Sequence, residues 1–69
     1  MNEETFNLEI RKFLKQFGVT AQREIEKAVG DAVRNGRLTG RERLQARAVL
    51  EVTGLGTLAV VEGEIALQQ

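Results

Sequence analysis

QFGVTAQREIEKAV, residues 16–29, decides how the first half of this chain is interpreted. Gly18 interrupts a run of apolar residues with helical spacing, and Thr20 precedes a second such run. Glycine favours the left-handed conformation that ends many helices, and threonine is a common N-cap residue. The stretch therefore predicts two helices joined by a Gly-Val-Thr turn. Such a turn fits both a DNA-binding helix-turn-helix and an ordinary helical hairpin.

Both predicted helices are amphipathic. The first covers residues 3–17, with Asn2 as its N-cap and Gly18 as its C-terminal stop. The second follows Thr20 and ends at Asn35-Gly36, with Gly30 on its polar side. The two apolar stripes consist of Phe6, Ile10, Phe13, Leu14 and Phe17 in the first helix, and Ala21, Ile25, Ala28, Val29, Ala32 and Val33 in the second.

The last third of the chain predicts a β-hairpin. Residues 44–53 alternate between apolar and polar side chains, as in a half-buried strand. A third helix competes for residues 41–52, because Thr39-Gly40-Arg41-Glu42 has the spacing of a capping box. The β-branched end of this segment, before Gly54-Leu55-Gly56, favours the strand. Residues 57–67 predict a second strand, with a bulge or turn at Glu62-Gly63.

These elements predict a single α+β domain over residues 1–69. Two antiparallel amphipathic helices pack on a C-terminal β-hairpin, in the order α-α-β-β. A hairpin is rarely stable without such cover. The predicted core consists of Phe6, Ile10, Phe13, Leu14, Phe17, Val19, Ile25, Val29, Val33, Leu38, Leu50, Val52 and Ile65.

The composition argues against an enzyme. The chain has no His, Cys, Ser, Tyr or Trp, so the usual general base and the common covalent nucleophiles are missing. Disulfides and Cys/His zinc sites are excluded as well. We therefore expect no catalytic residue, no cofactor-binding residue and no metal ligand. Leu, Ile, Val and Phe make up 21 of the 69 residues, too many for a disordered chain.

Two short segments imitate functional motifs. GLGTLA, residues 54–59, matches a dinucleotide-binding fingerprint in form, but that motif needs a following helix to hold the pyrophosphate. Glycines with positive φ in a tight turn between strands explain the segment better. Glu62 and Glu64 alone make a poor cation site, and a charged sheet edge is the more ordinary interpretation.

Basic residues are concentrated in the middle of the chain. Residues 11–47 have a net charge of +6, and the two ends together have −6. Arg23, Lys27 and Arg34 share one helix face, and Arg37 follows them. As a winged helix, the second predicted helix would enter a DNA groove and contact phosphates through these four residues. A solvated helix face, balanced by the acidic ends, is the simpler alternative, and zero net charge gives little long-range attraction.

The segments MNEETFN, RKFLKQFGVTAQREIEKAV and VVEGEI resemble a family of small uncharacterised bacterial proteins, a domain of unknown function. The resemblance runs from end to end and centres on RKFLKxxGVTxQREIE. It implies a free-standing bacterial protein of the cytoplasm and assigns no activity to any residue.

We therefore expect a non-enzymatic module that binds another protein or a second copy of itself. Nucleic-acid binding through Arg23, Lys27, Arg34 and Arg37 is the alternative. A membrane partner is not expected, since no apolar run approaches the roughly 18 residues of a membrane span. The absence of cysteine fits the reducing cytoplasm.

Overall fold

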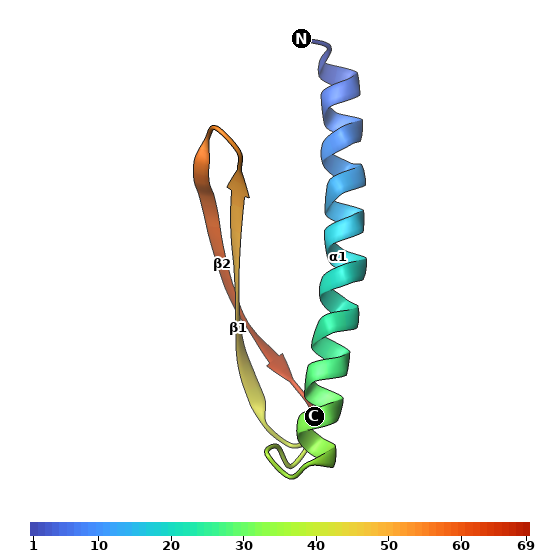
Figure 1. Cartoon of the computed structure of the whole chain (residues 1–69), viewed down its shortest axis with the longest axis vertical. Helices are drawn as coiled ribbons and strands as arrows, with labels where there is room; N and C mark the ends of the chain where they lie inside the picture. The colour runs from blue at the N-terminus through green and yellow to red at the C-terminus, as the bar shows by residue number, and fades with distance from the viewer. The chain divides into compact units, whose positions relative to one another are not determined.

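The computed structural model describes residues 1–69 and contains three elements. They are the helix α1 (Glu3–Arg34) and the strands β1 (Arg43–Val52) and β2 (Gly56–Ala66), labelled in Figure 1. The chain divides into two compact units, Met1–Arg37 and Leu38–Gln69. The α+β class and the C-terminal hairpin are confirmed. The prediction of two helices is wrong, because one helix covers both predicted segments.

The helix α1 runs without a break through Gly18, Val19 and Thr20. Gly18 does not have a positive φ, so it takes a helical conformation instead of the left-handed one that a stop requires. A glycine inside a helix costs only about 1 kcal/mol relative to alanine, and no proline removes a backbone donor. Thr20 is therefore an interior helical residue and caps nothing.

The actual ends of α1 carry well-formed caps. At the N-terminus, the Asn2 side chain accepts a hydrogen bond from the backbone N–H of Thr5 at 3.0 Å, as predicted for an N-cap. At the C-terminus, Arg37 N–H donates to the Ala32 carbonyl at 2.9 Å, and Gly36 N–H donates to the Val33 carbonyl at 3.2 Å. With Gly36 at φ 85°, these two bonds form a Schellman motif. The predicted end at Asn35-Gly36 is confirmed.

The segment between α1 and β1 is organised by one carboxylate. Glu42 accepts hydrogen bonds from the backbone N–H groups of Thr39 (2.8 Å), Gly40 (3.0 Å) and Arg41 (3.1 Å). The Thr39 hydroxyl accepts a further bond from Arg41 N–H. The Thr39–Glu42 contact resembles half of a capping box, yet a strand follows it. The alternative of a third helix over residues 41–52 is wrong.

Glu42 is expected to make this loop sensitive to acid. The pKa of Glu42 is lowered to about 2 from an ordinary value of 4.5. The largest cause is the hydrogen bond from the backbone N–H of Thr39, and the hydrogen bond from the backbone N–H of Gly40 adds to it. Because the folded pKa is depressed, the stabilisation is fully present above about pH 4.5 and is lost as the pH falls through about 2. An NMR titration should show the amide protons of Thr39 and Gly40 moving with this low pKa. Glu42→Gln should abolish the transition and Glu62→Gln should keep it, whereas a Glu42 pKa near 4.5 would contradict the expectation.

The strands β1 and β2 form one antiparallel ladder. Pairs run from Arg43 with Ala66 to Val52 with Gly56, and the register shifts where Leu50 pairs with Ala59 but Glu51 pairs with Thr57. Leu58 is therefore the extra residue of a β-bulge. The predicted irregularity at Glu62-Gly63 is wrong, since both residues pair regularly with Arg47 and Ala46.

The hairpin turn uses glycine as the sequence predicts. Gly54 and Gly56 have φ values of 89° and 77°, a region that other residues rarely adopt. Leu55 N–H donates to the Val52 carbonyl at 2.8 Å and closes the turn. Residues 54–59, which match the dinucleotide-binding fingerprint in form, thus make up the turn and the first residues of β2.

The two faces of the hairpin differ in chemistry. One face pairs Leu44 with Ile65 and Ala48 with Val61. On the other face, Arg43 contacts Glu64 at 2.6 Å and Arg47 contacts Glu62 at 3.7 Å. Glu62 and Glu64 therefore lie on one face, and each has an arginine opposite or diagonal to it. These exposed ion pairs are worth at most about 1 kcal/mol each.

The predicted core is wrong. Ala32, with 8% of its surface exposed, is the one buried hydrophobic residue, and it was not in the predicted core. None of the thirteen predicted core residues is buried: Val29, Leu38 and Ile65 are half-buried and the other ten are exposed. The reason is the missing second helix, because a lone helix gives its own apolar stripe no neighbouring helix to pack against.

Candidate interaction surface

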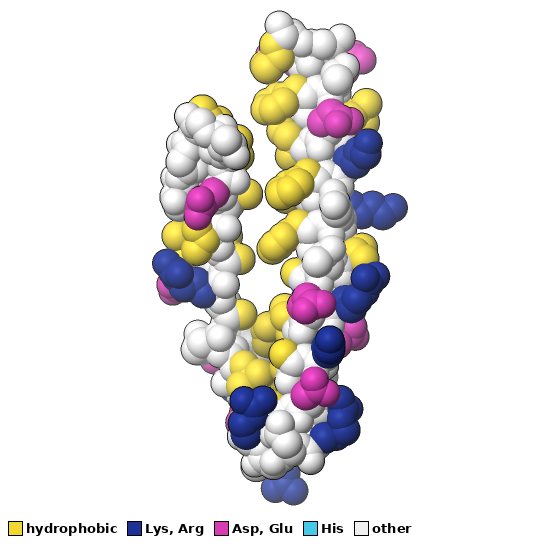
Figure 2. Space-filling model, viewed as in Figure 1, with side chains coloured by type: hydrophobic (Ala, Val, Ile, Leu, Met, Phe, Trp, Pro, Cys, Tyr) yellow, Lys and Arg dark blue, Asp and Glu magenta, His cyan; other side chains and the backbone are white.

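The most extensive feature of the first unit is a row of apolar side chains along α1. Figure 2 shows them in line over most of the helix. Phe6, Phe13 and Phe17 are each about half exposed, as is Leu14. We call this surface the apolar stripe. It consists of Phe6, Ile10, Leu14, Phe17, Ala21, Ile25, Ala28 and Ala32, with Phe13 at its edge.

The stripe keeps its phase across Gly18. Its members are separated by four, four and three residues, and this pattern then repeats, so Phe6, Phe17 and Ala28 are eleven residues apart. At 100° per residue, the eight positions lie within about 100° of arc. A turn at Gly18 would have reset the phase. The same signal was available in the sequence, and it identifies the two predicted stripes as one surface.

Side-chain size changes along the stripe. Phe6, Ile10, Leu14 and Phe17 lie in the N-terminal half, whereas Ala21, Ala28 and Ala32 dominate the C-terminal half, where Ile25 is the one large member. Val19, which we expected in the core, lies about 160° from Phe17 around the helix and is 52% exposed. The stripe is thus bulky at one end and nearly flat at the other.

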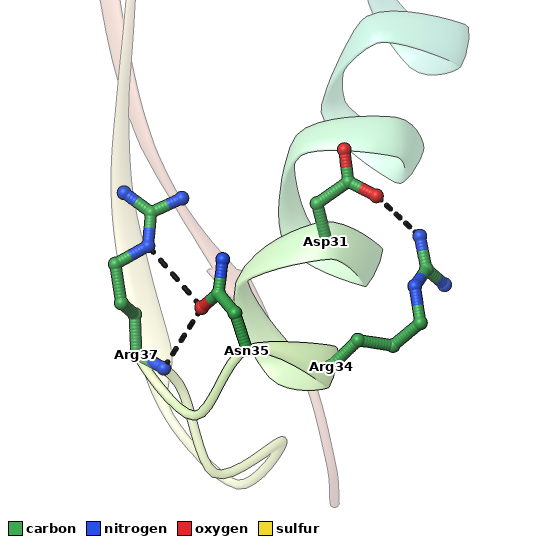
Figure 3. Close-up of polar contacts among 4 residues, drawn as sticks. All are labelled: Asp31, Arg34, Asn35 and Arg37. Atoms are coloured by element: carbon green, nitrogen blue, oxygen red, sulfur yellow. Dashed lines mark hydrogen bonds and ion pairs between the residues drawn. The ribbon is translucent and has the colours of Figure 1, made fainter.

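The basic residues of the alternative hypothesis lie outside the apolar stripe, with Lys27 nearest to its Phe13 edge. Arg23, Lys27 and Arg34 are exposed residues of α1, within about 40° of arc, as the sequence predicts. Arg34 forms an ion pair with Asp31, and the Asn35 side chain accepts hydrogen bonds from Arg37 N–H (3.1 Å) and Arg37 Nε (3.3 Å), as Figure 3 shows. Two of the four predicted phosphate contacts therefore already have partners.

The two-helix arrangement that the winged-helix alternative assumes is not formed. That arrangement needs a supporting helix before a separate reading helix, and the uninterrupted α1 supplies neither. The exposed basic face remains, but no turn presents it to a DNA groove.

Sites for small ligands are poorly developed. No three carboxylate, His or Cys side chains gather in a way that could hold a metal ion. An open depression on the hairpin is lined by Gln45, Ala46, Arg47 and Glu62, and it offers little enclosure. The helix α1 does not combine the length and apolar character needed to cross a membrane.

The chain belongs to a family of unknown function, DUF6494, which matches residues 1–68. This confirms the family resemblance seen in the sequence. No curated protein and no solved structure matches the chain significantly.

Proposed function

We propose that this member of a family of unknown function is a non-enzymatic interaction module that associates with itself through the apolar stripe of α1. The observation that carries the proposal is the exposure of three phenylalanines and Leu14 on one helix face. Aromatic residues each bury about 150–250 Å² in an interface, so the half-exposed phenylalanines alone offer a sizeable apolar area. Soluble proteins rarely leave such a continuous surface in water.

The length of α1 suits a second copy as the partner. A helix of 32 residues is about 48 Å long, and its stripe from Phe6 to Ala32 spans about 39 Å. The α1 helix of a second chain has the same span, so it can follow the stripe from end to end.

Stability supports the proposal as well. An isolated helix and a two-stranded hairpin are each marginal in water. Chains below about 70 residues commonly rely on disulfides, metals or association. This chain has no cysteine, and no cluster of side chains suited to a metal ion. Of these three means of stabilising a small chain, association with another chain remains.

The chemistry of the chain fits a module that catalyses nothing. It contains no His, Cys or Ser, and nucleic-acid binding is not favoured because the turn on which that hypothesis depended is absent. We place the protein in the bacterial cytoplasm, in keeping with its lack of cysteine.

Light scattering over a concentration series tests the proposal. We expect a mass twice that of the 7.7 kDa chain at micromolar concentrations, falling toward the monomer on dilution. Added duplex DNA at low salt should leave the mass unchanged. A helical monomer at all concentrations up to about 1 mM would overturn the proposal. Over that range, only a binding free energy weaker than about −4 kcal/mol goes undetected.

A further inference from the structure

We infer that the occupant of the apolar stripe is the stripe of a second copy, and that the two α1 helices run antiparallel. This inference rests on the proposed self-association and adds its orientation and register. Three observations support it: the distribution of side-chain sizes, the distribution of charge and the period of the stripe.

Side-chain sizes match in the antiparallel direction. If residue numbers facing each other sum to about 38, Phe6 faces the partner's Ala32, Ile10 faces the partner's Ala28, and Phe17 faces the partner's Ala21. Phe6, Ile10 and Phe17 then each meet a small side chain, which lets the two surfaces interdigitate, and Leu14 lies beside the partner's Ile25. A parallel pair would instead place Phe6 against Phe6 and Ala28 against Ala28, with crowding at one end and a gap at the other.

Charges favour the same direction. At the rim of the stripe, Glu9 and Lys27 lie at the same angle around the helix. An antiparallel pair brings Glu9 near the partner's Lys27, because residues at the same angle lie on the same side of such a contact. A parallel pair would instead bring the two acidic N-terminal turns together, with Glu3 beside its own copy. Like charges at such positions disfavour pairing.

The period of the stripe allows contact over the whole helix. A repeat of eleven residues corresponds to about 3.67 residues per turn, close to the 3.6 of a straight helix. Two such helices stay in contact with little supercoiling, slightly right-handed. The contact can therefore extend from Phe6 to Ala32.

Disulfide trapping tests the orientation, since the natural chain has no cysteine. The antiparallel register places residue 10 beside residue 28 of the partner, and about 27 Å from residue 10 of the partner. A disulfide needs Cβ atoms about 4 Å apart. A mixture of Ile10→Cys and Ala28→Cys in a glutathione buffer should therefore give a mixed dimer on a non-reducing gel, and neither variant alone should give a dimer.

Two further pairs guard against artefacts. Glu9→Cys with Lys27→Cys lies on the rim and leaves the apolar stripe intact, so it should crosslink even if the first pair weakens association. Lys12→Cys with Arg23→Cys lies on the opposite side of the helix and should stay unlinked.

The outcomes separate this inference from the proposed function. Mixed dimers that form only between complementary variants support the antiparallel pair. Disulfides within each variant alone, or a dimer mass without any crosslink, would overturn the antiparallel register and leave self-association standing. A monomer mass for the wild-type chain would overturn both.

Discussion

Phe17→Glu is expected to abolish self-association. Phe17 lies near the middle of the apolar stripe and is 50% exposed in the single chain. A charge at the centre of an apolar contact loses the burial of the ring and adds the cost of desolvating a carboxylate. We expect at least a 100-fold rise in the dissociation constant, equivalent to about 3 kcal/mol. Sedimentation equilibrium measures the constant directly.

Val19→Glu is the matched control for this variant. Val19 is two residues away, has nearly the same exposed fraction (52%) and also belongs to α1. It lies on the opposite side of the helix from the stripe, so the same charge should change the dissociation constant less than about threefold. Equal losses for the two variants would show that charge, rather than the stripe, controls association.

Ala21→Pro is expected to destroy the C-terminal half of α1. In an uninterrupted helix, proline at residue 21 removes the hydrogen bond to the Phe17 carbonyl and clashes with it, at a cost of about 3 kcal/mol or more. If Thr20 were an N-cap, residue 21 would be the first helical position, where proline is favoured. Circular dichroism at 222 nm distinguishes the two cases, because only the uninterrupted helix loses ellipticity.

Two other substitutions complete that experiment. Glu3→Pro places proline at the true first position, after the Asn2 cap, and should be tolerated. Gly18→Ala should stabilise the helix by about 1 kcal/mol, because a Cβ there meets no atom within 4 Å and the backbone is helical. A thermal melt in which Gly18→Ala lowers the midpoint would point to a turn at Gly18.

Local patterns in the sequence identify the two strands and both ends of the helix. The alternation from Leu44 to Val52 outweighed the capping-box spacing of Thr39 and Glu42, and the strand lies within one residue of its predicted bounds. The caps at Asn2 and Gly36 were also evident, since their residue types match the backbone geometry they serve. Strand alternation and helix caps depend on residues close together in the sequence, so they can be predicted without the rest of the fold.

The predictions are wrong where a single residue outweighs the surrounding pattern. Gly18 resembles a helix stop, but Phe17, Ala21 and Ile25 continue the stripe at intervals of four residues. The false break created a second helix, and that helix supplied the cover for a core that the chain does not form. No residue type near Leu58 marks the bulge in the sequence. Gly63 is the more obvious candidate, but it pairs regularly.

The candidate surface was only partly evident from the sequence. The sequence predicts its residues but places them in an interior, since an amphipathic helix has the same pattern whether its apolar side meets its own chain or another one. The basic residues Arg23, Lys27 and Arg34 were placed correctly on one face, but the pairing of Arg34 with Asp31 depends on side-chain conformation.

The continuous phase of α1 also constrains how the gene can vary in length. Each residue added or deleted between Phe17 and Ala21 would rotate Ile25 and Ala28 by 100° relative to Phe6 and Ile10. Removing eleven residues would rotate them by only about 20°. Length changes in α1 therefore preserve the stripe only in steps close to whole turns, such as seven or eleven residues, each of which shifts its phase by about 20°.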